Sequence, residues 1–227
     1  MSRFHESLGL QLLRAAVPRA LKSSIKAAAA SVMFPTTEMP HTRIGAEHVK
    51  GGEVLADRVS LIQRMDPNGV VAELGVDGGE FSHQILRNSH PKKLHLVDTW
   101  SSNRYHEGKL RHVERRFATE ISGGTIEINR GLSIDACVDF ADEYFDWIYI
   151  DTSHSYRTTI NELYAYERTV KQKGYICGHD YVVGNWSGGV RYGVIEAVAE
   201  FCVRRDWRIA YWTADYTESN SFALTRM

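Results

Sequence analysis

VVAELGVDGGEFSHQIL, residues 70–86, is the stretch that decides the fold. An apolar run opens it, glycines follow at positions 75, 78 and 79, and the remainder has the spacing of a helix. A buried strand that turns on glycine into a helix is the first half of a β-α-β unit. The glycines indicate that something lies close to the backbone of the turn.

The strand-helix alternation continues along the chain. Further strands are predicted at 94–98, 125–131, 145–151 and 174–180, and helices at 53–65, 80–88, 107–120, 133–141, 158–172 and 190–204. Two final strands, at 207–213 and 221–227, are separated only by a turn. This order predicts an α/β fold with a doubly wound, mostly parallel, seven-stranded Rossmann-like sheet that ends in an antiparallel hairpin.

Composition is typical of a globular protein and excludes some functions. The chain has 227 residues, 43% of them hydrophobic and 24% charged, with a formal net charge of −1. We therefore expect no nucleic-acid partner, which would require a basic excess. No run approaches the ~18 apolar residues of a membrane span, and no secretory signal is evident, so we expect a cytoplasmic protein. The three distant cysteines, Cys137, Cys177 and Cys202, are predicted to be buried thiols.

The first 50 residues differ from the rest. Through Thr37 they are rich in arginine, lysine and serine, and an alanine run at 27–30 precedes Pro35 and Pro40. We predict a helical appendage, residues 1–50, that caps the main domain at 51–227 or builds a contact in a homo-oligomer. A targeting segment and a helix on an anionic membrane surface have the same composition and remain alternatives.

The glycine turn indicates the kind of ligand. It lacks both the G-x-G-x-x-G spacing of a dinucleotide site and a P-loop lysine. Glu73-x-Gly75-x-x-x-Gly79 instead places an acid before the turn, which suits a cationic ligand better than a phosphate. Asp98 ends the next strand, where a carboxylate can bind both hydroxyls of a ribose. A cationic nucleoside without phosphates is S-adenosylmethionine.

At this point the sequence resembles the class I S-adenosylmethionine-dependent methyltransferases over roughly residues 50–227. Ile150-Asp151-x-x-His154-x-Tyr156 together with Gly178-His179-Asp180-Tyr181 resembles the macrocin-type and mycinamicin-type sugar O-methyltransferases. The resemblance implies a last strand inserted antiparallel between its neighbours. It also implies a set of cofactor-binding residues: Glu73, Gly75, Val76, Asp77, Gly79, Ser82, Asp98, Thr99, Ser133 and Asp151.

Methyl transfer to a hydroxyl needs a group that removes the proton. His154 is the candidate general base, because an imidazole titrates near neutral pH; the alternative is a histidine that only caps the following helix. Asp151 and Asp180 follow neighbouring strands, so we expect their side chains to converge. We therefore predict that His154, Asp151 and Asp180 are catalytic.

Two converging carboxylates also suit Mg²⁺, which lowers the pKa of a bound hydroxyl. The resembled sugar methyltransferases use three acidic ligands, two of them consecutive after the fifth strand. Here the first of that pair is His179, so the predicted metal set is Asp151, His179 and Asp180. An imidazole favours Zn²⁺, Mn²⁺ or no metal. Without metal, Asp151 orients His154 or contacts the methionine amino group, and Asp180 holds the acceptor.

The acceptor is predicted to be a hydroxylated small molecule, a sugar or a natural product. Two loops, 99–112 with Trp100 and 182–192 with Trp186, are candidates for its pocket, although both tryptophans also fit a packing role. Thr152-Ser153 stands where nucleic-acid amino-methyltransferases carry prolines. Two other classes stay open: a noncatalytic or hydroxylase-associated binding module on the same fold, and a short-chain reductase, whose Tyr-x-x-x-Lys is missing.

Overall fold

The computed structural model describes residues 39–185, 188–215 and 217–227. They divide into two compact units: one consists of residues 39–184 and 192–227, and the described part of the other consists of 185 and 188–191. Two short strands, β7 (Gly184–Asn185) and β8 (Val190–Arg191), form a sheet of their own. Trp186, a candidate for the acceptor pocket, lies outside the described residues.

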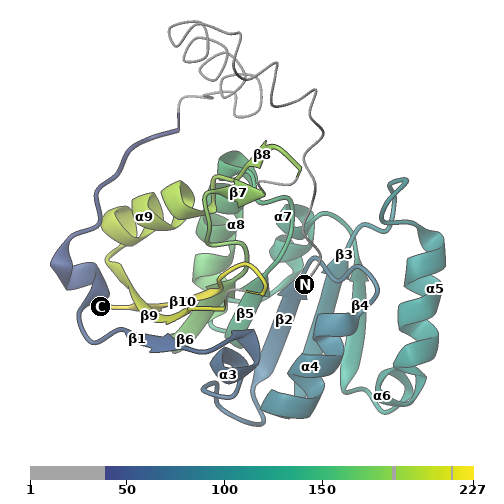
Figure 1. Cartoon of the computed structure of the whole chain (residues 1–227). Helices are drawn as coiled ribbons and strands as arrows, with labels where there is room; N and C mark the ends of the chain where they lie inside the picture. Colours follow the sequence, from purple (N-terminus) through teal and green to yellow (C-terminus); the bar gives the residue numbers. More distant parts are fainter. Residues whose placement is uncertain (1–38, 186–187, 216) are drawn as a thin grey trace, which may run out of the picture. The chain divides into compact units, whose positions relative to one another are not determined.

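The described part of the chain folds around an eight-stranded sheet in the order β1-β9-β10-β6-β5-β2-β3-β4 (Figure 1). Its strands are β1 (Glu53–Leu55), β2 (Val70–Leu74), β3 (Lys93–Asp98), β4 (Ile126–Arg130), β5 (Phe145–Ile150), β6 (Val170–Gly178), β9 (Trp207–Thr213) and β10 (Phe222–Arg226). All neighbours pair in parallel except β10, which lies antiparallel between β9 and β6. The predicted fold class and the inserted last strand are confirmed.

The strand count differs from the prediction by one. Residues 53–55, predicted as the start of a helix at 53–65, form the edge strand β1 beside β9. The helix that follows, α3 (Arg58–Ile62), is short and begins where the Asp57 carboxylate accepts a hydrogen bond from the Ser60 N–H at 2.6 Å. This N-cap separates the strand from the helix.

The helix predicted at 158–172 also ends early. Helix α8 (Tyr156–Tyr166) and a single 3₁₀ turn, η3 (Glu167–Thr169), are followed directly by β6. Val170 is fully buried and pairs with Phe145 of β5, and the Arg226 guanidinium donates to its carbonyl at 3.1 Å. Pairing across the sheet therefore prevails over the local helical pattern.

Helices cover both faces of the sheet. On one face lie α3, α4 (Glu80–Ser89) and α5 (Glu107–Arg116), and on the other α7 (Ser133–Ala136), α8 and α9 (Val194–Arg205) (Figure 1). The remaining elements are α6 (Ala118–Ser122), η1 (Ala46–Val49) and η2 (Cys137–Asp139). Strand alternation divides the core: Val71 packs with the first set, whereas Ala72 and Leu74 pack with the second.

The N-terminal region is described only from residue 39. Residues 39–50 lie in the same compact unit as the sheet, and a nitrogen of the buried His48 ring lies 2.7 Å from the Trp207 carbonyl oxygen. The rest of the appendage lies outside the described residues, so its role and the boundary at residue 50 stay predictions. All three cysteines are free and buried, as expected. None of the helices in the described part combines the length and apolarity needed to cross a bilayer.

A matched pair of leucines tests this core. Leu163 in α8 is fully buried, whereas Leu132, just before α7, is 60% exposed. We expect Leu163→Ala to lower the free energy of unfolding by about 3 kcal/mol, through lost burial and the cavity left behind. Leu132→Ala should change it by less than about 0.5 kcal/mol. Urea denaturation followed by circular dichroism measures both, and equal losses would contradict the assigned core.

Candidate active site

Four neighbouring strands end at one edge of the sheet, and each is followed or closed by a predicted site residue. In spatial order these are Asp98 of β3, Gly75 after β2, Asp151 after β5 and Asp180 after β6. The direction in which successive strands are added reverses between β2 and β5. Open α/β sheets bind ligands at such a reversal, outside the carboxyl ends of the strands.

The glycine turn packs directly against the end of β5. Gly75 has φ of +89°, and a Cβ there would lie 2.1 Å from the Asp151 carbonyl oxygen. Position 75 therefore requires glycine for both its conformation and its contact. Gly79, with φ of +79°, caps α4, and a Cβ there would lie 2.8 Å from the Phe117 ring. The turn is thus held close to both β5 and α5.

Asp98 organises the same turn from the β3 side. One of its oxygens accepts hydrogen bonds from the backbone N–H groups of Val76 and Asp77, at 2.9 and 3.0 Å. The Asp77 side chain pairs with Lys109, and its carbonyl accepts from the Trp100 indole at 3.0 Å. Trp100 is 1% exposed, so it has a packing role, which was the alternative to a place in the acceptor pocket.

Glu73 lies beneath the turn rather than on its surface. Its side chain is 1% exposed and accepts a hydrogen bond from the Ser82 hydroxyl in α4. Burial raises the pKa of Glu73 to about 8, a change that the Ser82 hydrogen bond partly opposes. The carboxyl group is therefore mostly protonated at neutral pH.

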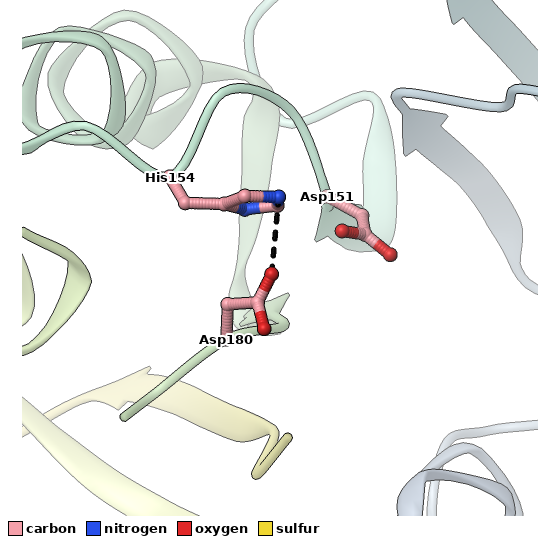
Figure 2. Close-up of side chains that lie close together, drawn as sticks. All are labelled: Asp151, His154 and Asp180. Carbon is pink, nitrogen blue, oxygen red and sulfur yellow. Dashed lines mark ion pairs between the residues drawn. The ribbon is translucent and has the colours of Figure 1, made fainter. Parts of the chain in front are cut away.

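The three predicted catalytic residues meet in space. Figure 2 shows the His154 ring above Asp180, with Asp151 beside it, and the His154 Nε2 lies 3.0 Å from Asp180 Oδ2. One ligand atom from each of the three side chains lies within 4.8 Å of the other two. Asp151 and His154 stay partly exposed, whereas Asp180 is buried. The convergence expected from the strand ends is present.

The backbone that carries these side chains is constrained. His154 and Asp180 both adopt the left-handed region, with φ of +56° and +54°. The His154 carbonyl accepts from the Gly193 N–H at 2.9 Å, and a Cβ at Gly193 would lie 2.3 Å from the Tyr156 nitrogen. Non-glycine residues held in this conformation are often found at functional sites. The contacts of Gly193, at the start of α9, fix the loop that carries His154.

Burial sets the charge of the cluster. It lowers the pKa of His154, against the attraction of Asp180, so the imidazole is neutral at pH 7 and can accept a proton. Burial also raises the pKa of Asp151 to about 7, helped by the neighbouring Asp180 and opposed by Arg58. The site thus holds a neutral base beside a carboxyl group that titrates near neutrality.

His179 lies at the rim of the same cluster. Its Nδ1 is 3.8 Å from both Asp151 Oδ2 and Asp180 Oδ1, and burial lowers the pKa of its ring. Its Nε2 is buried and has no hydrogen-bond partner among the described residues. Of the residues that the structure describes, the set close enough to hold a metal contains His154 rather than His179.

Two charged side chains at the site, Arg58 and Glu162, have no counterpart among the residues predicted from the sequence. Arg58 of α3 lies 4.0 Å from Asp151. Glu162 of α8 is fully buried and accepts hydrogen bonds from the hydroxyls of Ser133 and Thr152, and burial raises its pKa to about 7. Ser133 therefore contacts Glu162 in this structure. No local motif marks either residue, because both contacts join distant segments.

The remaining predicted cofactor residue is Thr99, directly after β3. Its carbonyl accepts a hydrogen bond from the Arg130 side chain at 3.3 Å. The predicted cofactor residues other than Ser133 thus lie on or beneath the turns after β2, β3 and β5.

Comparison with known proteins gives a family match for part of the chain. Residues 72–181 match a family model described as a methyltransferase domain. This segment is therefore similar to methyltransferase domains. It runs from β2 to the residue after Asp180, and so includes the glycine turn and the whole cluster. No curated protein matches the chain by sequence.

Solved structures share the methyltransferase fold at low identity. The pyocyanin biosynthetic protein PhzM is 12% identical with a TM-score of 0.58; the match covers 74% of this chain and 54% of PhzM, so the chain spans about half of that protein. The B. subtilis tRNA methyltransferase TrmK is 11% identical, with a TM-score of 0.55 and coverage of 76% and 67%. A Streptococcus mutans protein in complex with SAH is also 11% identical, with a TM-score of 0.53 and coverage of 74% and 93%. These likenesses show the fold and leave the acceptor open.

Gly75 and Gly124 form a matched pair for testing the tight contact. Both have positive φ, +89° and +77°, but only Gly75 has an atom within the reach of a Cβ. We expect Gly124→Ala to cost about 1 kcal/mol of unfolding free energy, the strain of the left-handed backbone. Gly75→Ala should cost more than about 3 kcal/mol, because the β5 end must also move. Equal costs in urea denaturation would contradict the contact.

Glu73 should make stability depend on pH. Because its folded pKa of about 8 exceeds its ordinary value of 4.5, the folded protein keeps a proton that the unfolded chain releases. Stability therefore falls as pH rises between these values. Relative to Glu73→Gln, the wild type should lose about 2 kcal/mol of unfolding free energy between pH 6 and pH 9. Parallel pH profiles for the two proteins would rule out a protonated Glu73.

Proposed function

We propose that the domain transfers a methyl group from S-adenosylmethionine to a hydroxyl of a small molecule, a sugar or a natural product. The observation that carries the proposal is the dyad of His154 and Asp180 at the strand ends. A partly exposed imidazole bound to a buried carboxylate at 3.0 Å is an arrangement for removing a proton.

The dyad assigns a role to each nitrogen of the His154 ring. With the proton on Nε2, His154 donates to Asp180, and Nδ1 keeps its lone pair. Nδ1 would then take the proton of the acceptor hydroxyl as its oxygen bonds to the methyl carbon; the bond from that carbon to sulfur would break, and S-adenosylhomocysteine would leave as a neutral thioether. Asp180 stabilises the imidazolium that results, which is the role of the carboxylate in histidine dyads.

The residues after the strands fit the cofactor chemically. When bound, S-adenosylmethionine supplies a methyl group on a positively charged sulfur, which is the electrophile of the reaction. The Gly75 turn offers backbone without side chains, and Asp98 offers a carboxylate at the end of β3 for ribose hydroxyls. Asp151 offers a second carboxylate, which suits the methionine ammonium group.

A divalent metal is an alternative use of the same cluster. Asp151, His154 and Asp180 supply two carboxylates and an imidazole, a donor set that suits Mn²⁺ or Zn²⁺ better than Mg²⁺. Such an ion would lower the pKa of the acceptor hydroxyl. The ion would also bind a nitrogen of His154 or displace Asp180 from the ring, so it would disrupt the dyad. The base mechanism therefore predicts activity in EDTA.

Removal of the base tests the proposal. A panel of hydroxylated sugars and phenols is incubated with the protein and S-adenosylmethionine in EDTA, and S-adenosylhomocysteine formation is measured. We expect His154→Ala to lower turnover by at least about 100-fold, the usual contribution of a general base. Asp151→Ala should also abolish transfer. Binding of S-adenosylhomocysteine to His154→Ala, measured by calorimetry, should stay within about 3-fold of wild type.

A histidine outside the cluster provides the control. His112→Ala removes an exposed histidine of α5 and should leave turnover unchanged. Loss of cofactor binding in His154→Ala would remove His154 from the base role. Activity only after addition of a divalent ion would replace the base mechanism with metal activation. Transfer to tRNA, and to no small molecule, would overturn the proposed acceptor class.

A further inference from the structure

Arg58 lies against the active site although it precedes the glycine turn in sequence. Its Nη1 is 4.0 Å from Asp151 Oδ2, and its guanidinium carbon lies 4.5 Å from the centre of the Phe81 ring. Phe81 belongs to the first turn of α4, two residues after Gly79. The guanidinium therefore lies between the end of β5 and the helix that the glycine turn begins.

The donors of Arg58 are only partly used. Its Nε pairs at 2.9 Å with Oε2 of Glu218, an acidic residue in the turn between β9 and β10. The 4.0 Å separation from Asp151 exceeds hydrogen-bond length. Among the described residues, no hydrogen bond occupies either Nη group. Glu218 and Phe81 thus orient the guanidinium. Its N–H donors have the planar, paired geometry that matches the two oxygens of a carboxylate.

Arg58 and Asp151 together complement an amino-acid zwitterion. The α-carbon of an amino acid carries an ammonium and a carboxylate as neighbours, and the two side chains present the opposite charges as neighbours. We propose that Arg58 binds the carboxylate of the methionine moiety of S-adenosylmethionine while Asp151 accepts its ammonium group. The inference rests on the proposed function, because it assigns a subsite of the same cofactor.

A purely structural role makes a different prediction. If Arg58 only neutralised Asp151, its removal would disturb every ligand of the site to a similar degree. A carboxylate subsite affects only ligands that carry the carboxylate. Two related compounds separate these cases: S-adenosylhomocysteine contains the amino-acid group, whereas 5′-methylthioadenosine keeps the nucleoside and the sulfur but lacks that group.

The experiment is calorimetric titration of both compounds into wild type, Arg58→Ala, Arg58→Lys and Arg64→Ala. Arg64 is a matched control, because it also pairs with a glutamate, Glu53 at 3.0 Å, and lies over a ring, Tyr211 at 6.0 Å. We expect Arg58→Ala to weaken S-adenosylhomocysteine binding about 10- to 100-fold, the range of a lost charge-assisted hydrogen bond. Arg58→Lys should fall between wild type and alanine, and Arg64→Ala should bind both compounds as wild type does.

Binding of 5′-methylthioadenosine decides the interpretation. We expect Arg58→Ala to bind it within about 2-fold of wild type, which also shows that the variant is folded. Equal weakening of both compounds, or of neither, would overturn the carboxylate subsite. If wild type binds neither compound, the proposed function itself fails, and this outcome is distinct from a failure of Arg58 alone.

Discussion

The close contact between Gly75 and the Asp151 carbonyl is the constraint on which the site depends. No side chain fits between them, so the ends of β2 and β5 approach at the point where strand order reverses. Backbone hydrogen bonds secure the approach: the Asp151 N–H donates to Leu74 at 2.8 Å, and the Gly75 N–H donates to Val97 at 2.9 Å. The ends of β3, β2 and β5 are therefore fixed together before any ligand binds, as preorganised binding requires.

This arrangement concentrates acidic groups at one edge of the sheet. Glu73, Asp98, Asp151 and Asp180 all lie there, and Arg58 is a cation set among them. Burial makes full ionisation of such a cluster unfavourable, which is why the pKa values of Glu73 and Asp151 rise. A ligand that brings positive charge relieves the repulsion. A sulfonium cofactor with an ammonium group suits this environment better than a phosphorylated nucleotide does.

Sequence reasoning succeeded where a local pattern carried the information. The apolar runs predicted the strands, and the strand ends predicted that Asp151 and Asp180 would converge. It failed for β1, because three residues beside a helix start have no periodicity of their own. Arg58 was missed because its contact with Asp151 joins segments that are far apart in the sequence. Glu162 was missed because its burial comes from Ser133 and Thr152, which lie in other elements.

A crystal structure of the protein with S-adenosylhomocysteine tests the central claim most directly. The account predicts the nucleoside along the turns after β2 and β3, the amino-acid group beside Asp151, and the sulfur on the side of Asp151 that faces His154. Such a pose would place the transferred methyl group within reach of a hydroxyl held by the base. A ligand bound elsewhere, or a sulfur turned away from His154, would contradict the account.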